Sequence, residues 1–145
     1  MSLVNTFMAY ANAFEDAYRS DDWSKLDLYF TEDAVYETIA DQPFANRTEG
    51  RQAMKAFFKQ MVDGFDRRFD SRSIEFIEGP TERSGRVWFR WAATYARAGA
   101  PALRMEGEET AEFEGDRIKR LEDRMPPATT QCAMQFMTEH GAKLK

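Results

Sequence analysis

The fold of this chain is decided by one stretch, DWSKLDLYFTEDAVYE, which covers residues 22–37. Its first half predicts a short helix whose apolar side carries Trp23 and Leu26. Asp22 is well placed to cap that helix, because its short side chain can accept hydrogen bonds from the first free backbone N–H groups. An acidic turn follows, and a strand is expected to begin at Ala34. The stretch therefore predicts a change from helical to extended backbone.

Two further helices are predicted on either side of this stretch. Apolar residues recur with a helical period over Leu3–Tyr18 and again over Arg51–Val62, which is typical of helices that bury one face. The second of these helices is expected to end near Gly64, because glycine readily adopts the left-handed conformation found at helix ends. The polar segment around Pro43, between the early strand and this helix, is expected to be an irregular loop.

Beyond Arg72 the hydrophobic period becomes that of strands. Alternation of apolar and polar residues predicts strands over Ser73–Glu78, Val87–Ala96, Leu103–Phe113 and Arg117–Met125. The first of these strands is expected to stop at Gly79-Pro80. Three helices, the early strand and this meander predict an α+β domain in which a strongly curved antiparallel sheet wraps the helices.

Length suits one domain, which we expect to cover residues 1–126, with residues 127–145 forming a C-terminal helical extension of it. In that extension Cys132, Phe136 and His140 follow one another at four-residue spacing, as on one side of a helix. The extension is expected to pack on its own sheet, while closure of a pocket mouth and contact with a partner subunit stay open as alternatives.

Composition excludes several function classes. The net charge is −5, with 20 basic against 25 acidic residues, so a nucleic-acid interface is not expected. With Cys132 and His140 as the only residues of their types, neither a disulfide within the chain nor a zinc site of Cys and His is expected. We expect no cofactor and no membrane contact, and the absence of a leader-like N-terminus favours a cytoplasmic location.

Three short motifs carry a family resemblance. They are the opening stretch, Gly50-Arg51-x-Ala53-Met54-x-x-Phe57-Phe58, and Phe113-x-Gly115-Asp116-x-Ile118. In this order they resemble the SnoaL-like branch of the nuclear transport factor two-like superfamily. The resemblance implies a conical α+β barrel whose cavity receives a small hydrophobic molecule. It also implies a homodimer formed through the convex face of the sheet.

Two acidic residues are the candidates for catalysis. If Phe113 and Trp91 face the cavity, strand alternation places Glu109 on the same side, and the family's pattern favours the phase that turns Asp123 inward. A carboxyl group in an apolar cavity loses hydration of its charged form, so its pKa rises toward the range useful for proton transfer. Two alternatives stay open: Glu109 could lie on a solvated face, and Asp123 could pair with Arg120 or Arg124 at the surface.

The remaining candidates are apolar and aromatic side chains that would form the wall of the ligand cavity. They are Phe14, Tyr18, Trp23, Tyr36, Phe58, Phe89, Trp91, Tyr95, Met105, Phe113, Leu121 and Met125. The polar groups of the tyrosines and tryptophans among them could hydrogen-bond a ligand.

Known enzymes of the superfamily narrow the chemistry. The tyrosine, base and second acid of ketosteroid isomerase correspond here to Phe14, Thr38 and Glu109, so that mechanism is not carried over. The epoxide hydrolase branch needs an arginine between two acids, but Arg90 and Arg120 are expected on the outer face. The SnoaL-like polyketide cyclases resemble the chain best, with Asp123 matching their general base. Two functions remain: proton transfer next to a carbonyl, as in an isomerase, cyclase or lyase, or ligand binding without turnover.

Overall fold

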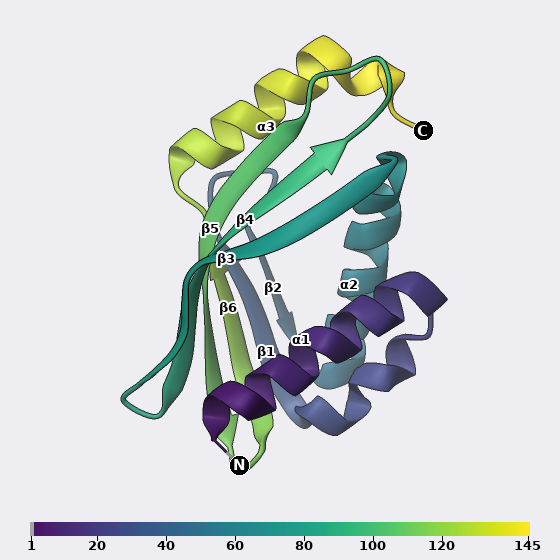
Figure 1. Ribbon diagram of the computed structural model, residues 1–145. Coiled ribbons are helices and arrows are strands. Elements are labelled where there is room, and N and C mark those ends of the chain that lie inside the picture. The colour runs from purple at the N-terminus through teal and green to yellow at the C-terminus, as the bar shows by residue number, and fades with distance from the viewer. Residues whose placement is uncertain (1) are drawn as a thin grey trace.

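A computed structural model describes residues 2–145 and shows a curved, six-stranded sheet wrapped around helices (Figure 1). The elements are α1 (Leu3–Ser20), η1 (Trp23–Tyr29), β1 (Phe30–Ile39), β2 (Asn46–Glu49), α2 (Arg51–Gly64), η2 (Asp66–Arg68), β3 (Ser71–Arg83), β4 (Arg86–Ala96), β5 (Leu103–Glu114), β6 (Arg117–Arg124), α3 (Pro127–His140) and η3 (Gly141–Lys143). The strand order across the sheet is β2-β1-β6-β5-β4-β3. The α+β class and the C-terminal helix are thus confirmed.

The stretch at residues 22–37 folds largely as its sequence indicates. Asp22 caps the helix that follows it, accepting a hydrogen bond from the Ser24 backbone N–H at 3.2 Å. That helix, η1, is a 3₁₀ helix, and the strand begins at Phe30 rather than at Ala34. Phe30 is fully buried and pairs with Ile118 on β6. The strand therefore starts early, because pairing with the last strand requires extended backbone at Phe30.

Three sheet predictions are wrong. The sheet is mixed rather than antiparallel, because β1 runs parallel to β6. The segment expected to be a loop contains β2, which pairs with β1. Strand β3 does not stop at Gly79-Pro80 but continues to Arg83. It can do so because β3 is an edge strand, where a proline without an N–H is tolerated.

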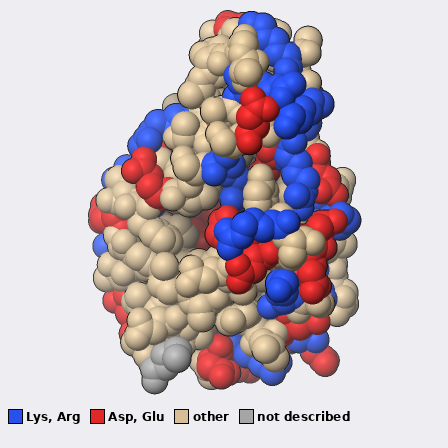
Figure 2. All heavy atoms as spheres, turned by 45° about the vertical axis from the view of Figure 1, so that its right-hand side comes forward, with Lys and Arg blue, Asp and Glu red and all other residues tan. Residues whose placement is uncertain are grey.

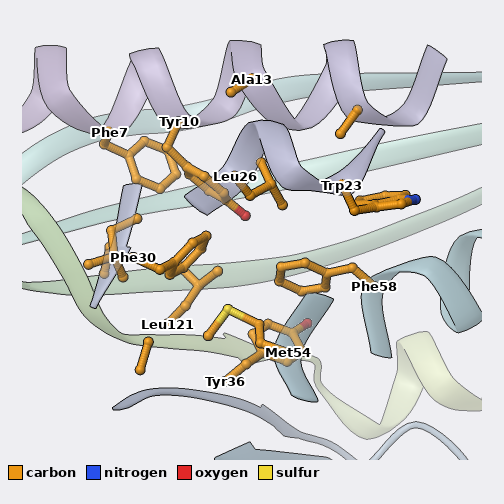
Figure 3. Packing of buried hydrophobic residues seen from close by; sticks show 14 of the residues in the cluster. Phe7, Tyr10, Ala13, Trp23, Leu26, Phe30, Tyr36, Met54, Phe58 and Leu121 are labelled. Carbon is orange, nitrogen blue, oxygen red and sulfur yellow. The ribbon is translucent and has the colours of Figure 1, made fainter. Parts of the chain in front are cut away.

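Buried side chains form two hydrophobic clusters. The first fills the space between the sheet and the helices α1, η1 and α2, and Figure 3 shows aromatic rings from these elements packed together. Within it the ring centroids of Tyr10 and Phe30 are 5.1 Å apart and those of Tyr36 and Phe58 are 5.0 Å apart, both with edge-to-face geometry. The second cluster lies under α3. Between them the clusters hold the sheet curved around a space that side chains fill incompletely.

Helix α3 packs on its own sheet. Ala133 is fully buried and Phe136 is 6% exposed, and the Thr129 hydroxyl donates to the Glu106 carbonyl on β5 at 2.8 Å. Figure 1 shows α3 along the end of the sheet away from α1. This arrangement confirms the first of the three roles considered for the extension.

Replacing Leu26 with Ala tests the first cluster. The Leu26 side chain is fully buried, whereas Leu28, two residues away on the same helix, is 73% exposed. We expect Leu26→Ala to lower the free energy of unfolding by about 2–5 kcal/mol, because it removes buried methyl groups and leaves a cavity. Leu28→Ala should change it by less than about 0.5 kcal/mol. Urea unfolding followed by circular dichroism measures both, and equal effects would contradict this packing.

Candidate active site

A cavity of about 480 Å³ lies between the inner face of the sheet and the helices α1 and α2. A volume of this size matches the pockets that usually receive small organic ligands. In Figure 2 the surface has a central hollow bordered by uncharged residues on the left and by charged residues on the right, with acidic atoms visible inside it. The cavity therefore combines an apolar wall with an acidic floor.

The acidic floor contains the two carboxyl groups predicted from the sequence. Glu109 on β5 and Asp123 on β6 are direct cross-strand neighbours, and both line the cavity. Since Glu109 lines the cavity, it does not lie on a solvated outer face. Asp123 does not form a surface ion pair, because Arg120 and Arg124 pair with Glu122, at 3.0 and 3.3 Å. The strand phases assumed for β5 and β6 are therefore correct.

Hydrogen bonds fix Asp123 from the neighbouring strand. The Tyr36 hydroxyl on β1 donates to Asp123 Oδ2 at 2.6 Å, and the Thr38 hydroxyl donates to Tyr36 at 3.2 Å. Parallel pairing of β1 with β6 makes this relay possible, because it sets Thr38 opposite Asp123 and Tyr36 opposite Leu121. The Oδ2 atom of the carboxylate is thus held from β1.

The two carboxyl groups differ in their affinity for a proton. Both are partly accessible from the cavity, yet the protein packed around them removes most of the water that would hydrate a charge. Burial and the neighbouring Asp123 charge raise the pKa of Glu109 well above its ordinary value. Burial also raises the pKa of Asp123 to about 6, while hydrogen bonds from Tyr36 and Glu109 oppose the rise. Two neighbouring carboxyl groups that have lost most of their water favour sharing one proton, and the hydrogen bonds to Asp123 favour the form in which Asp123 is ionised and Glu109 carries the proton.

Tyr10 is a site residue that the sequence analysis did not include. It lies on α1, one turn before Phe14, is 5% exposed and lines the cavity. Burial raises its pKa, and the carboxyl groups of Glu109 and Asp123 raise it further, so the phenol stays neutral and can donate a hydrogen bond. The signal in the sequence was its place between Phe7 and Phe14 on the apolar face of the helix.

A second polar cluster also lines the cavity. Arg72 on β3 donates two hydrogen bonds to Glu15 on α1, at 2.9 and 3.2 Å, and its Nε lies 2.8 Å from Asp66. Its guanidinium stacks on the Tyr18 ring at 4.5 Å, so Tyr18 lies behind this cluster. Burial raises the pKa of Asp66 to about 6, although Arg72 opposes the rise. The cluster joins α1, η2 and β3 and leaves little of the Arg72 charge uncompensated.

Arginines of the outer face lie where the sequence indicates. Arg90 is exposed, and Arg120 makes an ion pair with Glu37 at 2.6 Å. The arginine that does reach the cavity, Arg72, stands just before the predicted strand Ser73–Glu78 and was not considered.

Most of the predicted wall residues line the cavity. They are Phe14, Tyr36, Phe58, Phe89, Trp91, Tyr95, Met105, Leu121 and Met125. Three others, Tyr18, Trp23 and Phe113, lie outside the lining. Trp23 is buried and donates its indole N–H to Asp21 at 3.0 Å, and Phe113 follows an irregularity in the pairing of β5 with β6. None of these positions shows that a ligand binds, so the binding roles stay predictions.

Residues 2–145 offer no group of three or more His, Cys, Asp or Glu side chains arranged to hold a metal ion. His140 lies on α3 against Phe136, with ring centroids 5.3 Å apart, and is not part of the cavity lining. In the same part of the chain, no helix is long and apolar enough to cross a bilayer.

Comparison with known proteins agrees with this architecture. A family model described as a SnoaL-like domain matches residues 11–121. Among curated proteins, no sequence matches the chain.

Solved structures share the fold at low sequence identity. A putative isomerase from Bacillus subtilis has a TM-score of 0.67 and 18% identity, covering 93% of this chain and 96% of that one. An epoxide hydrolase of M. tuberculosis, described as LEH-like, has a TM-score of 0.65 and 14% identity, covering 96% and 97%. An NTF2-like protein of unknown function from Exiguobacterium has a TM-score of 0.62 and 15% identity, covering 83% and 98%. At these identities the likeness shows the fold alone.

The carboxyl pair predicts a pH-dependent stability. Because the pKa of Asp123 is raised on folding, the folded state binds its proton more tightly than the unfolded chain does. We therefore expect the free energy of unfolding to fall as the pH rises from about 4 to about 6, by up to about 3 kcal/mol from this group. Asp123→Asn should make that part of the profile shallower, although the raised pKa values of Glu109 and Asp66 keep some slope in the same direction. Denaturant titrations at several pH values measure the change.

Asp33→Asn is the control for this experiment, because Asp33 lies on β1 and is exposed. Its profile should follow that of the wild type. An Asp123→Asn profile as steep as the wild-type one would show that Asp123 does not gain a proton on folding.

Proposed function

Since the chain belongs to the SnoaL-like domain family, we propose that its cavity binds a small, mostly apolar carbonyl compound and moves a proton next to the carbonyl group. In this proposal Asp123 is the general base. Tyr10 donates a hydrogen bond to the carbonyl oxygen as negative charge develops on it, and neutral Glu109, whose proton is directed to Asp123 in the free protein, turns that proton to the same oxygen when the substrate binds. Tyr36 holds the base in place.

One observation carries the proposal: two neighbouring carboxyl groups share an apolar cavity whose surroundings raise the pKa of Glu109 well above its ordinary value and that of Asp123 to about 6. Environments that push the pKa values of two acids apart are the usual basis for dividing the roles of base and acid. A base with a pKa of about 6 is ionised at neutral pH yet still has affinity for a proton. Catalysis of proton transfer needs both properties.

The hydrogen bonds give each group one role. Tyr36 already donates to Asp123 Oδ2, so it orients the base rather than holding the substrate oxygen. Tyr95 lies between Phe65 and Phe69, with ring centroids 5.1 Å away in each case, in the part of the cavity near Arg72. Of the tyrosines that line the cavity, Tyr10 is therefore the better donor to the oxygen, because it lies near both carboxyl groups of the pair and its hydroxyl is not engaged with Asp123.

Ligand binding without turnover is the second candidate function. It is favoured by Phe14 and Thr38, which stand where ketosteroid isomerase keeps a tyrosine and its base. Phe14 instead packs edge-to-face on Trp23 and Phe58, with ring centroids 5.5 Å from each, as part of an aromatic wall. A wall of this kind sequesters an apolar molecule whether or not chemistry follows.

Two expectations about the protein's context remain proposals: a homodimer formed through the convex face of the sheet, and a cytoplasmic location. The convex face is rich in ion pairs, such as Arg86 with Glu112 at 2.7 Å. A dimer there would bury paired charges rather than an apolar surface.

Isomerisation of 3-cyclohexen-1-one to its conjugated isomer tests the catalytic proposal. The reaction moves a proton next to a carbonyl, and conjugation raises the ultraviolet absorbance. We expect the wild type to accelerate it, and Asp123→Asn to lower kcat/KM by about 10²–10⁴-fold. Glu109→Gln, which still donates a hydrogen bond, should lose less than Glu109→Ala.

Asp33→Asn, an exposed carboxylate on β1, is the matched control and should keep full activity. Binding of the conjugated ketone, followed by tryptophan fluorescence, separates the two functions. Binding with no acceleration over buffer would support the non-catalytic function, and absence of both would refute the two together.

The pH dependence of the same reaction tests the base. Since Asp123 must be ionised to accept a proton, kcat/KM should rise with pH and level off above about 6. Tyr36→Phe removes a hydrogen bond to the charged form and should move the midpoint of this rise to higher pH. A midpoint that Tyr36→Phe leaves unchanged would contradict the assignment of the base.

A further inference from the structure

The indole of Trp91 lies over a glycine on the neighbouring strand. Trp91 on β4 and Gly107 on β5 are directly opposite each other. A Cβ atom at Gly107 would lie 2.6 Å from Trp91 Cζ2, 2.9 Å from Trp91 Cε2 and 2.8 Å from the Arg124 carbonyl oxygen on β6. Real Cβ atoms do not approach other atoms so closely, so only glycine leaves the space that the indole occupies. The ring thus extends across β5 toward the strand that carries Asp123.

The N–H group of this indole is buried and makes no hydrogen bond of ordinary geometry within residues 2–145. A buried N–H without a partner costs free energy, so its position needs a physical explanation. Its Nε1 atom is bonded to Cε2, which lies over Gly107, and Trp91 lines the same cavity as Asp123. The indole lowers the pKa of the Asp123 carboxyl. The N–H therefore stabilises the charge of Asp123 without forming a full hydrogen bond.

We propose that Trp91 is a positioning residue for Asp123, with its indole N–H held beside the Asp123 carboxylate by the space that Gly107 leaves open. Tyr36 holds the carboxylate from β1, and Trp91 holds it from the side of β4. Fixing a base between two donors keeps it in the orientation that proton transfer requires. This inference rests on the proposed function only for the role of Asp123 as the base.

Other groups that face Asp123 must be separated from this effect. They are Glu109 on β5, Tyr36 on β1 and Tyr10 on α1, with Glu122 adjacent on β6 itself. Trp91 differs from the ionisable groups among them because it bears no charge at any working pH. Removing its N–H therefore changes the field at Asp123 without adding a titration of its own.

Titration of Asp123 in the free protein tests the inference without any substrate. Protein labelled with ¹³C at the aspartate carboxyl carbons gives the Asp123 midpoint by NMR, with the signal assigned by its loss in Asp123→Asn. We expect Trp91→Phe, which keeps a ring but removes the N–H, to raise the midpoint by roughly one pH unit. Trp88→Phe, on the same strand but stacked under Arg83 at 4.0 Å, should leave it unchanged.

Gly107→Ala tests the role of the glycine. Its Cβ should displace the indole and raise the midpoint in the same direction, whereas Gly141→Ala, where only ordinary contacts of 3.6 Å or more arise, should not. In the Trp91→Phe background Gly107→Ala should add little, because the two changes act through one group. Circular dichroism checks that each variant is folded. If one variant does not fold, the Asp123 midpoint of the other still tests whether the indole acts on Asp123.

An unchanged Asp123 midpoint in Trp91→Phe would overturn the inference. Fully additive shifts of Trp91→Phe and Gly107→Ala would overturn the role of Gly107. Failure of the proposed function looks different: the midpoint would move as expected while the wild type does not accelerate isomerisation of 3-cyclohexen-1-one. If the enzyme is active, the rise of kcat/KM in Trp91→Phe should shift to higher pH by the same amount as the NMR midpoint.

Discussion

Parallel hydrogen bonding between β1 and β6 brings together segments from opposite ends of the chain. Tyr36 and Asp123, 87 residues apart, meet across this ladder at 2.6 Å. The same strand pairing places Phe30 next to Ile118 of β6. Both residues belong to the first hydrophobic cluster, which also contains residues of η1 and α2. Without it the sheet would end at β6, and Asp123 would lie on an unpaired edge open to water.

The electrostatics of the cavity follow from that closure. Once β1 covers the edge of β6, Asp123 and Glu109 face a space walled by aromatic rings, and both lose hydration. Two neighbouring carboxyl groups in such a place cannot both be ionised at neutral pH without a large cost, so one keeps its proton. A tyrosine and a tryptophan from flanking strands then favour the ionised form of Asp123 over that of Glu109. The difference in proton affinity between Glu109 and Asp123 thus comes from side chains on the neighbouring strands.

Several features could be predicted from the sequence because they depend on local periodicity. Alternation along β5 placed Glu109 inward, and the period of 3.6 defined α1 and α2. On β6 alternation left two phases, and the family resemblance favoured the one with Asp123 inward, which is the phase observed. Other features depend on partners distant in the chain. Strand β2 is only four residues long and polar, so it has no recognisable pattern before it pairs with β1. Tyr10 was missed because periodicity gives the face of a helix but not which turn of that face meets a cavity.

By itself the sequence determined the helices, the places of the long strands and, up to the irregularity at Phe113, the side of the sheet on which the side chains of β5 lie, because these follow from the backbone period and from burial of apolar groups. Only the tertiary structure decided the chemical character of the cavity. A carboxyl group becomes a base with a raised pKa only when other segments remove its water and supply its donors. Three different strands bring Tyr36, Trp91 and Gly107 close to Asp123. No local pattern in the sequence predicts which residues of separate strands become neighbours.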